Sequence, residues 1–172
     1  LDDKLLYVSS LIMIAAILGL LVLNFPFGKI FLGDGGAYLI GTYVAVLVMM
    51  LPIRHEEVSP FVSLLMVIFP IYELVRTVFR RLSSDFRALT YPDSNHLHSI
   101  LYKHMLSRKK ASLLVVNCKS SLLCLMLPLI SCLISVCFYN NINVIWISIL
   151  VYILIIEMLF LILSKKNHKQ NK

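Results

Sequence analysis

A glycine-rich segment carries the first residues that could do chemistry. It reads GDGGA over residues 33–37 and, together with Gly28, contains four of the protein's six glycines. Glycines let the backbone adopt positive φ and approach a ligand closely, while successive N–H groups can surround an anion. Asp34 could hold Mg²⁺ against a diphosphate, because Mg²⁺ prefers one or two protein carboxylates completed by phosphate oxygens. Lys29 could add a phosphate contact. The alternative is a tight re-entrant turn in which Asp34 caps a helix that begins near Ala37.

Two histidines separated by one residue form the second candidate group. Pro92 and Asp93 precede a run of apolar residues at helical spacing, which predicts a short amphipathic helix with His96 and His98 in its first turn. Residues two apart on a helix do not share a face, which disfavours a two-histidine zinc site unless this turn is extended. Imidazoles at a helix N-terminus suit phosphate binding instead. The alternative is a pair of solvated surface histidines.

Other charged residues lie within apolar stretches. Glu73, Arg76 and Arg80 stand three and four residues apart, a spacing that predicts an ion pair along one helix. For Glu157 we expect a partner in helix packing before a catalytic role. The four cysteines have spacings that match no metal-binding pattern, so we interpret them as small lipid- or helix-facing residues; they are Cys118, Cys124, Cys132 and Cys137.

The elements that position these groups are membrane helices. Of the 172 residues, 59% are hydrophobic and 15% are charged, and the mean hydropathy is +0.87. This composition lies outside the range of soluble globular proteins. A spanning helix needs about 20 mostly apolar residues, and five stretches qualify. They cover approximately residues 5–23, 37–53, 60–79, 113–138 and 143–163. The fold class predicted is an all-α integral membrane protein with two functional cytoplasmic loops.

The distribution of basic residues predicts the orientation. Lys29, the segment 80–112 and the basic tail 165–172 lie on one side of the predicted membrane, whereas only Lys4 and Arg54 lie on the other. Under the positive-inside rule, the first side is cytoplasmic. Leu1 is then outside and Lys172 inside, in the bacterial inner membrane. The net charge of +7 is thus a topology signal, and we expect no nucleic-acid partner.

Four motifs occur in an order typical of one enzyme family. They are Asn-Phe at 24–25, Lys-Ile-Phe-Leu-Gly-Asp-Gly-Gly at 29–36, Phe-Pro-Ile-Tyr-Glu at 69–73, and Pro-Asp-x-x-His-x-His at 92–98. This order resembles the polyprenyl-phosphate N-acetylhexosamine-1-phosphate transferases. The family includes the phospho-MurNAc-pentapeptide translocase of peptidoglycan synthesis and the GlcNAc-1-phosphate transferases that begin O-antigen and teichoic-acid assembly.

The resemblance implies a magnesium-dependent reaction, with Mn²⁺ as the alternative ion. It assigns catalytic roles to Asp34, as the metal-associated aspartate, and to His96 and His98, facing a UDP-N-acetylhexosamine. Glu73 matches an acidic position of the family. The implied substrate-binding positions are Asn24, Lys29, Gly33, Gly35 and Gly36. Three positions depart from many members and are interpreted as subgroup variation; they are Ala37, Ser94 and Ser99.

The resemblance also implies a lipid acceptor and an N-terminal half of the enzyme that these residues do not contain. The acceptor is a polyprenyl (undecaprenyl) phosphate in the membrane, and a homodimer stays an open alternative for the assembly. Family members carry an Asp-Asp pair and an Asn/Asp-rich motif in an N-terminal half, whereas Asp2 and Asp3 are expected outside. Residues 1–164 are therefore expected to be the C-terminal half of a sugar-phosphate transferase. The rival functions are an inactive membrane fragment or assembly subunit and, less favoured, an anion transporter.

Overall fold

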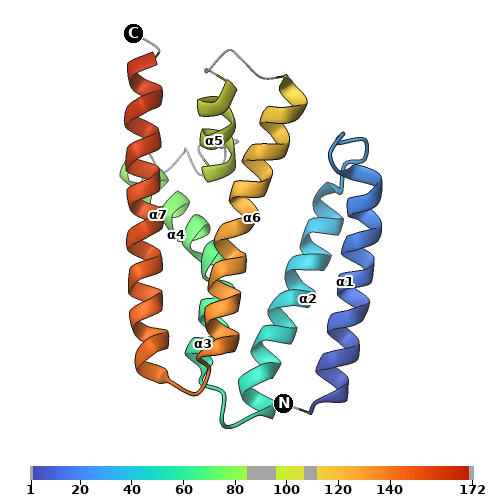
Figure 1. The fold of residues 1–172 in the computed structure, drawn as a ribbon. Coiled ribbons are helices and arrows are strands. Elements are labelled where there is room, and N and C mark those ends of the chain that lie inside the picture. Colours follow the sequence, from blue (N-terminus) through green and yellow to red (C-terminus); the bar gives the residue numbers. More distant parts are fainter. Residues whose placement is uncertain (1, 85–95, 107–111, 171–172) are drawn as a thin grey trace.

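The computed structural model describes residues 2–84, 96–106 and 112–170, and every element within them is a helix (Figure 1). Pro92, Asp93, Ser94 and the basic residues 108–110 lie outside the described residues. The helices are α1 (Lys4–Asn24), α2 (Gly33–Arg54), α3 (Pro60–Met66), α4 (Ile68–Ser84), α5 (Leu97–Leu106), α6 (Leu113–Cys137) and α7 (Ile142–Gln170).

Four of these helices, α1, α2, α6 and α7, are long and apolar enough to cross a membrane. Helices α3 and α4 form a bent pair, and the number of candidate spans rises to five if this pair is taken as a single span. Short connections join antiparallel neighbours, as in other helical bundles. These observations confirm the predicted all-α, multi-pass architecture.

The third predicted span, 60–79, is not one straight helix, and the expectation of a single helix there is wrong. It breaks at Val67, and α3 and α4 meet at a bend of 74°. Pro70 explains the position of the break, because a proline has no N–H for the carbonyl four residues earlier and its ring clashes with that carbonyl. The residue four earlier is Met66, where α3 ends. Its freed carbonyl accepts a hydrogen bond from Cys132 Sγ on α6, at 3.5 Å.

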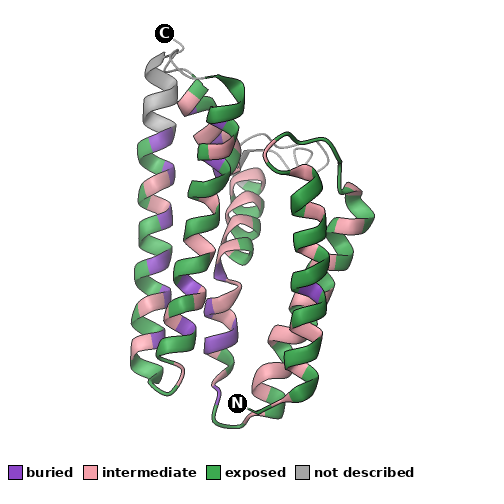
Figure 2. Cartoon of the chain, turned by 45° about the vertical axis from the view of Figure 1, so that its right-hand side comes forward, coloured by how far each residue is buried: buried purple, intermediate pink, exposed green. Residues whose placement is uncertain are grey.

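The buried core joins α3, α5 and α7. Residues along one face of α7, from Ile145 to Leu163, recur three or four positions apart and pack against apolar side chains of α3 and α5. The ring of Phe61 on α3 packs against that of Trp146 on α7, with centroids 4.0 Å apart and the rings tilted by 44°. In Figure 2 the buried residues accordingly follow one side of α7 and of α3. This core holds α5 in place beside the bundle.

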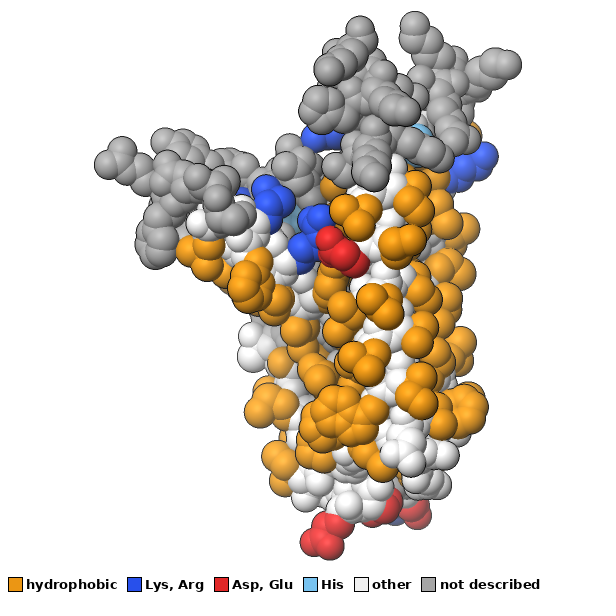
Figure 3. Space-filling model, turned by 90° about the vertical axis from the view of Figure 1, so that its left-hand side faces the viewer, with side chains coloured by type: hydrophobic (Ala, Val, Ile, Leu, Met, Phe, Trp, Pro, Cys, Tyr) orange, Lys and Arg blue, Asp and Glu red, His pale blue; other side chains and the backbone are white. Residues whose placement is uncertain are grey.

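The outer flanks of the bundle are apolar. Figure 3 shows hydrophobic side chains covering one such flank, with Lys and Arg toward one end and acidic residues at the other. Exposed apolar residues also run along α1 and α2, where α1 packs chiefly on α2. Apolar surface of this extent is typical of a helix bundle in contact with lipid or with further helices.

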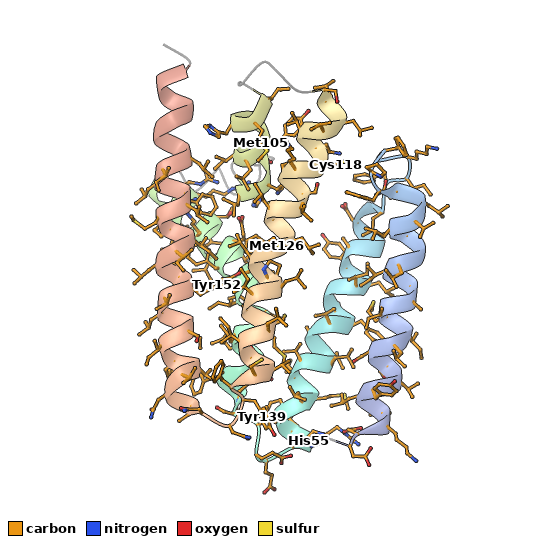
Figure 4. All side chains as sticks on the ribbon, in the orientation of Figure 1. His55, Met105, Cys118, Met126, Tyr139 and Tyr152 are labelled. Carbon is orange, nitrogen blue, oxygen red and sulfur yellow. The ribbon has the colours of Figure 1, made fainter. Side chains whose placement is uncertain are left out.

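The two ends of the bundle differ in what they carry. The loop between α1 and α2, the helix α5 and the C-terminal end of α7 lie at one end (Figure 1). In Figure 4, Met105 and Cys118 lie toward this end, whereas His55 and Tyr139 lie at the opposite end. The glycine-rich motif and the histidine motif therefore share one end, and Asp3 lies at the other. The end that carries the glycine-rich and histidine motifs is called the polar end below.

Candidate functional site

The loop between α1 and α2 is a tight turn closed by Asn24. Its side-chain Oδ1 accepts a hydrogen bond from the N–H of Ile30 at 3.3 Å, and its carbonyl accepts one from the N–H of Gly28 at 2.6 Å. Gly28 has φ of 61° and Gly33 has φ of 70°, values that residues with a side chain rarely adopt. The turn thus depends on Asn24 and on both glycines, and it brings the chain back into α2.

Asp34 lies in the first turn of α2, which begins at Gly33. The alternative in which Asp34 caps a helix beginning near Ala37 is therefore wrong, because the positive φ of Gly33 allows the helix to start four residues earlier. Asp34 is exposed. Within residues 2–84, 96–106 and 112–163 its carboxylate has no hydrogen-bonding or ionic partner. It is thus available to a ligand at the polar end.

The remaining glycines of the motif differ in their surroundings. A Cβ added at Gly36 would lie 2.5 Å from Leu32 Cδ1 and 2.8 Å from Leu32 Cγ, so a larger residue here would require the exposed Leu32 side chain to move. Gly35 faces open space and lines a shallow groove along α2 with Tyr38 and Tyr43. The Nζ of Lys29 lies 5.4 Å from the ring centroid of Phe27, in cation–π contact.

The two histidines lie at the start of α5. This helix begins at Leu97, so His98 is in its first turn and His96 directly precedes it. Their rings are stacked, with centroids 5.9 Å apart and an interplanar angle of 7°. His96 was predicted in the first turn of the helix but precedes it. The rule that residues two apart on a helix do not share a face therefore does not apply to this pair. The Nε2 of His98 lies 3.1 Å from Ser99 Oγ.

Glu73 on α4 holds His96 in position. One carboxylate oxygen lies 3.0 Å from His96 Nδ1, and the other accepts the backbone N–H of Leu97 at 3.0 Å. Of the residues for which an ion pair along this helix was predicted, Glu73 and Arg76 do not pair with each other but with groups on different helices. Glu73 instead satisfies a free N–H at the N-terminus of α5, where a negative charge is also favoured by the helix dipole.

Arg76 turns toward α7 and pairs with Glu157. Its Nε lies 3.3 Å from Glu157 Oε2, and its guanidinium lies 3.6 Å from the ring centroid of Phe160. The hydroxyl of Tyr72 donates a hydrogen bond to the same carboxylate. The expectation that Glu157 serves helix packing is confirmed, since these contacts join α4 to α7.

Two adjoining pockets open between these elements. The first, of ≈ 250 Å³, is lined by His98, Ser99, Tyr102, Lys103, Asn117, Ser120 and Ser121. The second, of ≈ 300 Å³, lies beside Asn24, Gly28 and the C-terminal turns of α1, and it shares Asn117 and Ser121 with the first. The two shared residues therefore connect the glycine-rich turn to the histidine motif.

Asn117 and Ser121 are candidate site residues that the sequence analysis missed. The available signal was a group of polar residues, Asn117, Ser120 and Ser121, in the first turns of an otherwise apolar helix. Polar groups in a membrane helix usually face other helices or a polar cavity. Ser120 is buried and donates its hydroxyl to the carbonyl of Asn117 at 3.0 Å. It lines the first pocket only, whereas Asn117 and Ser121 line both.

The donor groups present suit a metal ion only in part. Across the residues that the structure describes, no group of three or more His, Cys, Asp or Glu side chains could hold a metal. Asp34 is a single exposed carboxylate, which fits Mg²⁺ when phosphate oxygens of a substrate complete the coordination. The polar end can therefore offer one carboxylate, two imidazoles and uncharged hydrogen-bonding groups to a phosphorylated ligand.

The fold is that of a multi-pass helical membrane protein. The groups at its polar end suit a phosphorylated ligand. Residues 2–52 match the family model "Glycosyl transferase family 4". These residues include the first two of the four motifs, and this similarity, with those to curated relatives, confirms the resemblance to the family. No solved structure matches the chain.

The curated relatives carry the name undecaprenyl-phosphate alpha-N-acetylglucosaminyl 1-phosphate transferase. The protein from Haemophilus influenzae is 32% identical over 115 residues, which cover 62% of this chain and 31% of the relative. The Pasteurella multocida protein is 31% identical over 115 residues, which again cover 62% of this chain and 31% of the relative. The Escherichia coli K12 protein is 30% identical over 108 residues, or 60% of this chain and 29% of the relative. The match thus spans about a third of the length of these relatives.

Proposed function

We propose that this chain forms part of an enzyme that transfers N-acetylhexosamine 1-phosphate from a UDP-sugar to a polyprenyl phosphate, which begins a cell-envelope polysaccharide. The observation that carries the proposal is that the pocket beside Asn24 and Gly28 adjoins the pocket lined by His98, since both include Asn117. Asp34 follows the same loop, in the first turn of α2. The polar end would face the cytoplasm, where nucleotide sugars are found, with the inner membrane around the apolar flanks.

The reaction is a phosphoryl transfer. An oxygen of the polyprenyl phosphate attacks the β-phosphorus of the UDP-sugar, a new P–O bond forms, and the bond between that phosphorus and the bridging oxygen breaks. UMP leaves with the bridging oxygen, and the sugar stays on the lipid as a diphosphate. Such reactions depend mainly on positioning and on neutralising phosphate charge.

The residues of the polar end can both position the substrates and neutralise phosphate charge. The imidazoles of His96 and His98 can donate hydrogen bonds to phosphate oxygens, and Lys103 in the same pocket adds positive charge. Asn117 and Ser121 are uncharged and suit hydroxyl or amide groups, such as those of an N-acetylated sugar. Asp34 would hold Mg²⁺, or Mn²⁺, against the diphosphate, and the ion would neutralise charge there.

The proposal is tested by measuring UMP release from UDP-N-acetylglucosamine in membranes that contain the full-length protein and undecaprenyl phosphate. Asp34→Asn should reduce turnover by 100-fold or more, at the scale of roughly 10²–10³ seen when one electrostatic contact to the reacting group is lost. Asp2→Asn is the matched control, since Asp2 is an exposed aspartate at the opposite end. Near-normal turnover by Asp34→Asn would overturn the role of Asp34.

A further inference from the structure

We infer that Glu73 is a positioning residue that decides which ring nitrogen of His96 meets the substrate. The inference rests on the proposed function, because it concerns how His96 would act on a phosphorylated donor. It adds a residue of α4 to a site otherwise built from α2, α5 and α6.

Both oxygens of the Glu73 carboxylate are used at the start of α5. Oε2 lies 3.0 Å from His96 Nδ1, and Oε1 accepts the N–H of Leu97 at 3.0 Å. The Glu73 side chain is only 14% exposed, so few water molecules compete for it. An ionised carboxylate can only accept hydrogen bonds, and therefore the proton must sit on Nδ1 of His96.

The opposite nitrogen of His96 is then left for a ligand. With Nδ1 protonated, Nε2 accepts a hydrogen bond in the neutral ring and donates one in the imidazolium. The His96 side chain is 36% exposed, and its ring is stacked on that of His98, which lines the ≈ 250 Å³ pocket. Glu73 thus presents Nε2 of His96 beside this pocket.

The helix that carries Glu73, α4, is held against α7 by Arg76. Three residues further along α4, Arg76 pairs with Glu157 at 3.3 Å and covers the ring of Phe160. These contacts hold α4 on α7, while Glu73 reaches α5 from the same helix. The position of His96 is therefore set by contacts to α4 and not by α5 alone. A carboxylate that orients a histidine in this way is common in enzyme sites.

The test compares Glu73→Gln with Glu157→Gln in the full-length protein, by measuring UMP release as a function of pH. Glutamine keeps the shape of Glu73 but loses the charge. We expect kcat to fall about 10-fold or more, and the dependence of kcat on pH to change, because an amide can also donate to Nδ1 and no longer fixes the proton there. Glu157→Gln removes a carboxylate that also anchors α4 but does not touch His96, so its pH profile should match that of the wild type.

A double-mutant cycle completes the test. In a His96→Ala background, Glu73→Gln should cause no further loss of kcat, because the two residues would act as one unit. Glu73→Asp keeps the charge on a shorter side chain, so kcat should depend on pH as in the wild type. This variant replaces Glu73→Gln in the test if the latter does not fold. An unchanged pH profile in an active Glu73→Gln enzyme would overturn the role of Glu73. A wild-type protein without UMP release would overturn the proposed function itself.

Discussion

The Nε of Arg76 on α4 lies 3.3 Å from Oε2 of Glu157 on α7, 81 residues further along the chain. Arg76 and Glu73 could have paired along one helix, yet each pairs with a different helix instead. Arg76 holds α7, and Glu73 holds the start of α5. In this way the short helix α4 connects two elements that carry or support the candidate site.

We expect Glu157→Gln to lower the thermal stability of the protein in detergent. The substitution removes the charge that Arg76 faces and weakens the hydrogen bond from Tyr72. Hydrogen bonds to charged groups contribute about 1.5–3 kcal/mol. We expect the lower part of that range, because Glu157 is 45% exposed. The midpoint can be followed by loss of monodisperse protein on heating, with the exposed Glu56→Gln as the control. Equal midpoints for both variants would show that the pair contributes nothing to stability.

We expect Gly33→Ala to destabilise the protein more than Gly35→Ala does. Gly33 has φ of 70°, and a side chain in that conformation costs about 1–2 kcal/mol. Gly35 lies in the first turn of α2 with open space around it, where alanine is tolerated and favours the helix. The same heating experiment compares the two. A larger loss for Gly35→Ala would contradict the observed start of α2 at Gly33.

A pH-dependent contact is expected at the end of the bundle opposite the candidate site. Asp3 caps α1 by accepting the N–H groups of Leu5 and Leu6, and it also pairs with Arg54 at the end of α2. The Arg54 guanidinium beside Asp3 is the main cause that lowers the pKa of that carboxyl from 3.8 to about 2. A carboxyl with a lowered pKa in the folded state stabilises the fold fully above its unfolded pKa, and this contribution disappears as the pH falls toward 2.

Asp3→Asn isolates this charge, because asparagine also caps a helix well. The wild type should be more stable than the variant above about pH 5, and the difference should shrink steadily as the pH falls toward the pKa of about 2. Thermal midpoints measured at several pH values check this. A difference that stays constant across this range would mean that the charge of Asp3 is not what stabilises the contact between α1 and α2.

The helices were largely predictable from the sequence, because long apolar runs have few alternatives in a membrane. The runs at 5–23 and 143–163 fall within α1 and α7. The bend at Val67 was not predicted, although Pro70 marks it in the sequence. A proline in an apolar run can sit inside a continuous helix, as Pro52 and Pro128 do here, and only the packing shows which proline interrupts the chain.

The site was predictable in its motifs but not in its contacts. Asp34, His96 and His98 are recognisable from type and spacing, whereas the partner of His96 is 23 residues away on another helix. The three-residue spacing favoured an ion pair between Glu73 and Arg76. Glu73 instead accepts the free N–H of Leu97, a partner that no pattern along α4 could reveal. Asn117 and Ser121 were missed for the same reason, since their role depends on which elements face α6.

The most direct test of the proposed reaction follows the β-phosphorus of the donor. UDP-N-acetylglucosamine labelled with ³²P at the β-phosphate is incubated with undecaprenyl phosphate and membranes containing the full-length protein. Transfer of sugar 1-phosphate predicts that the label moves into the lipid fraction while unlabelled UMP is released, and that Asp34→Asn prevents both. Label that stays in soluble UDP while the sugar reaches the lipid would contradict the account, because the sugar would then have moved without its phosphate.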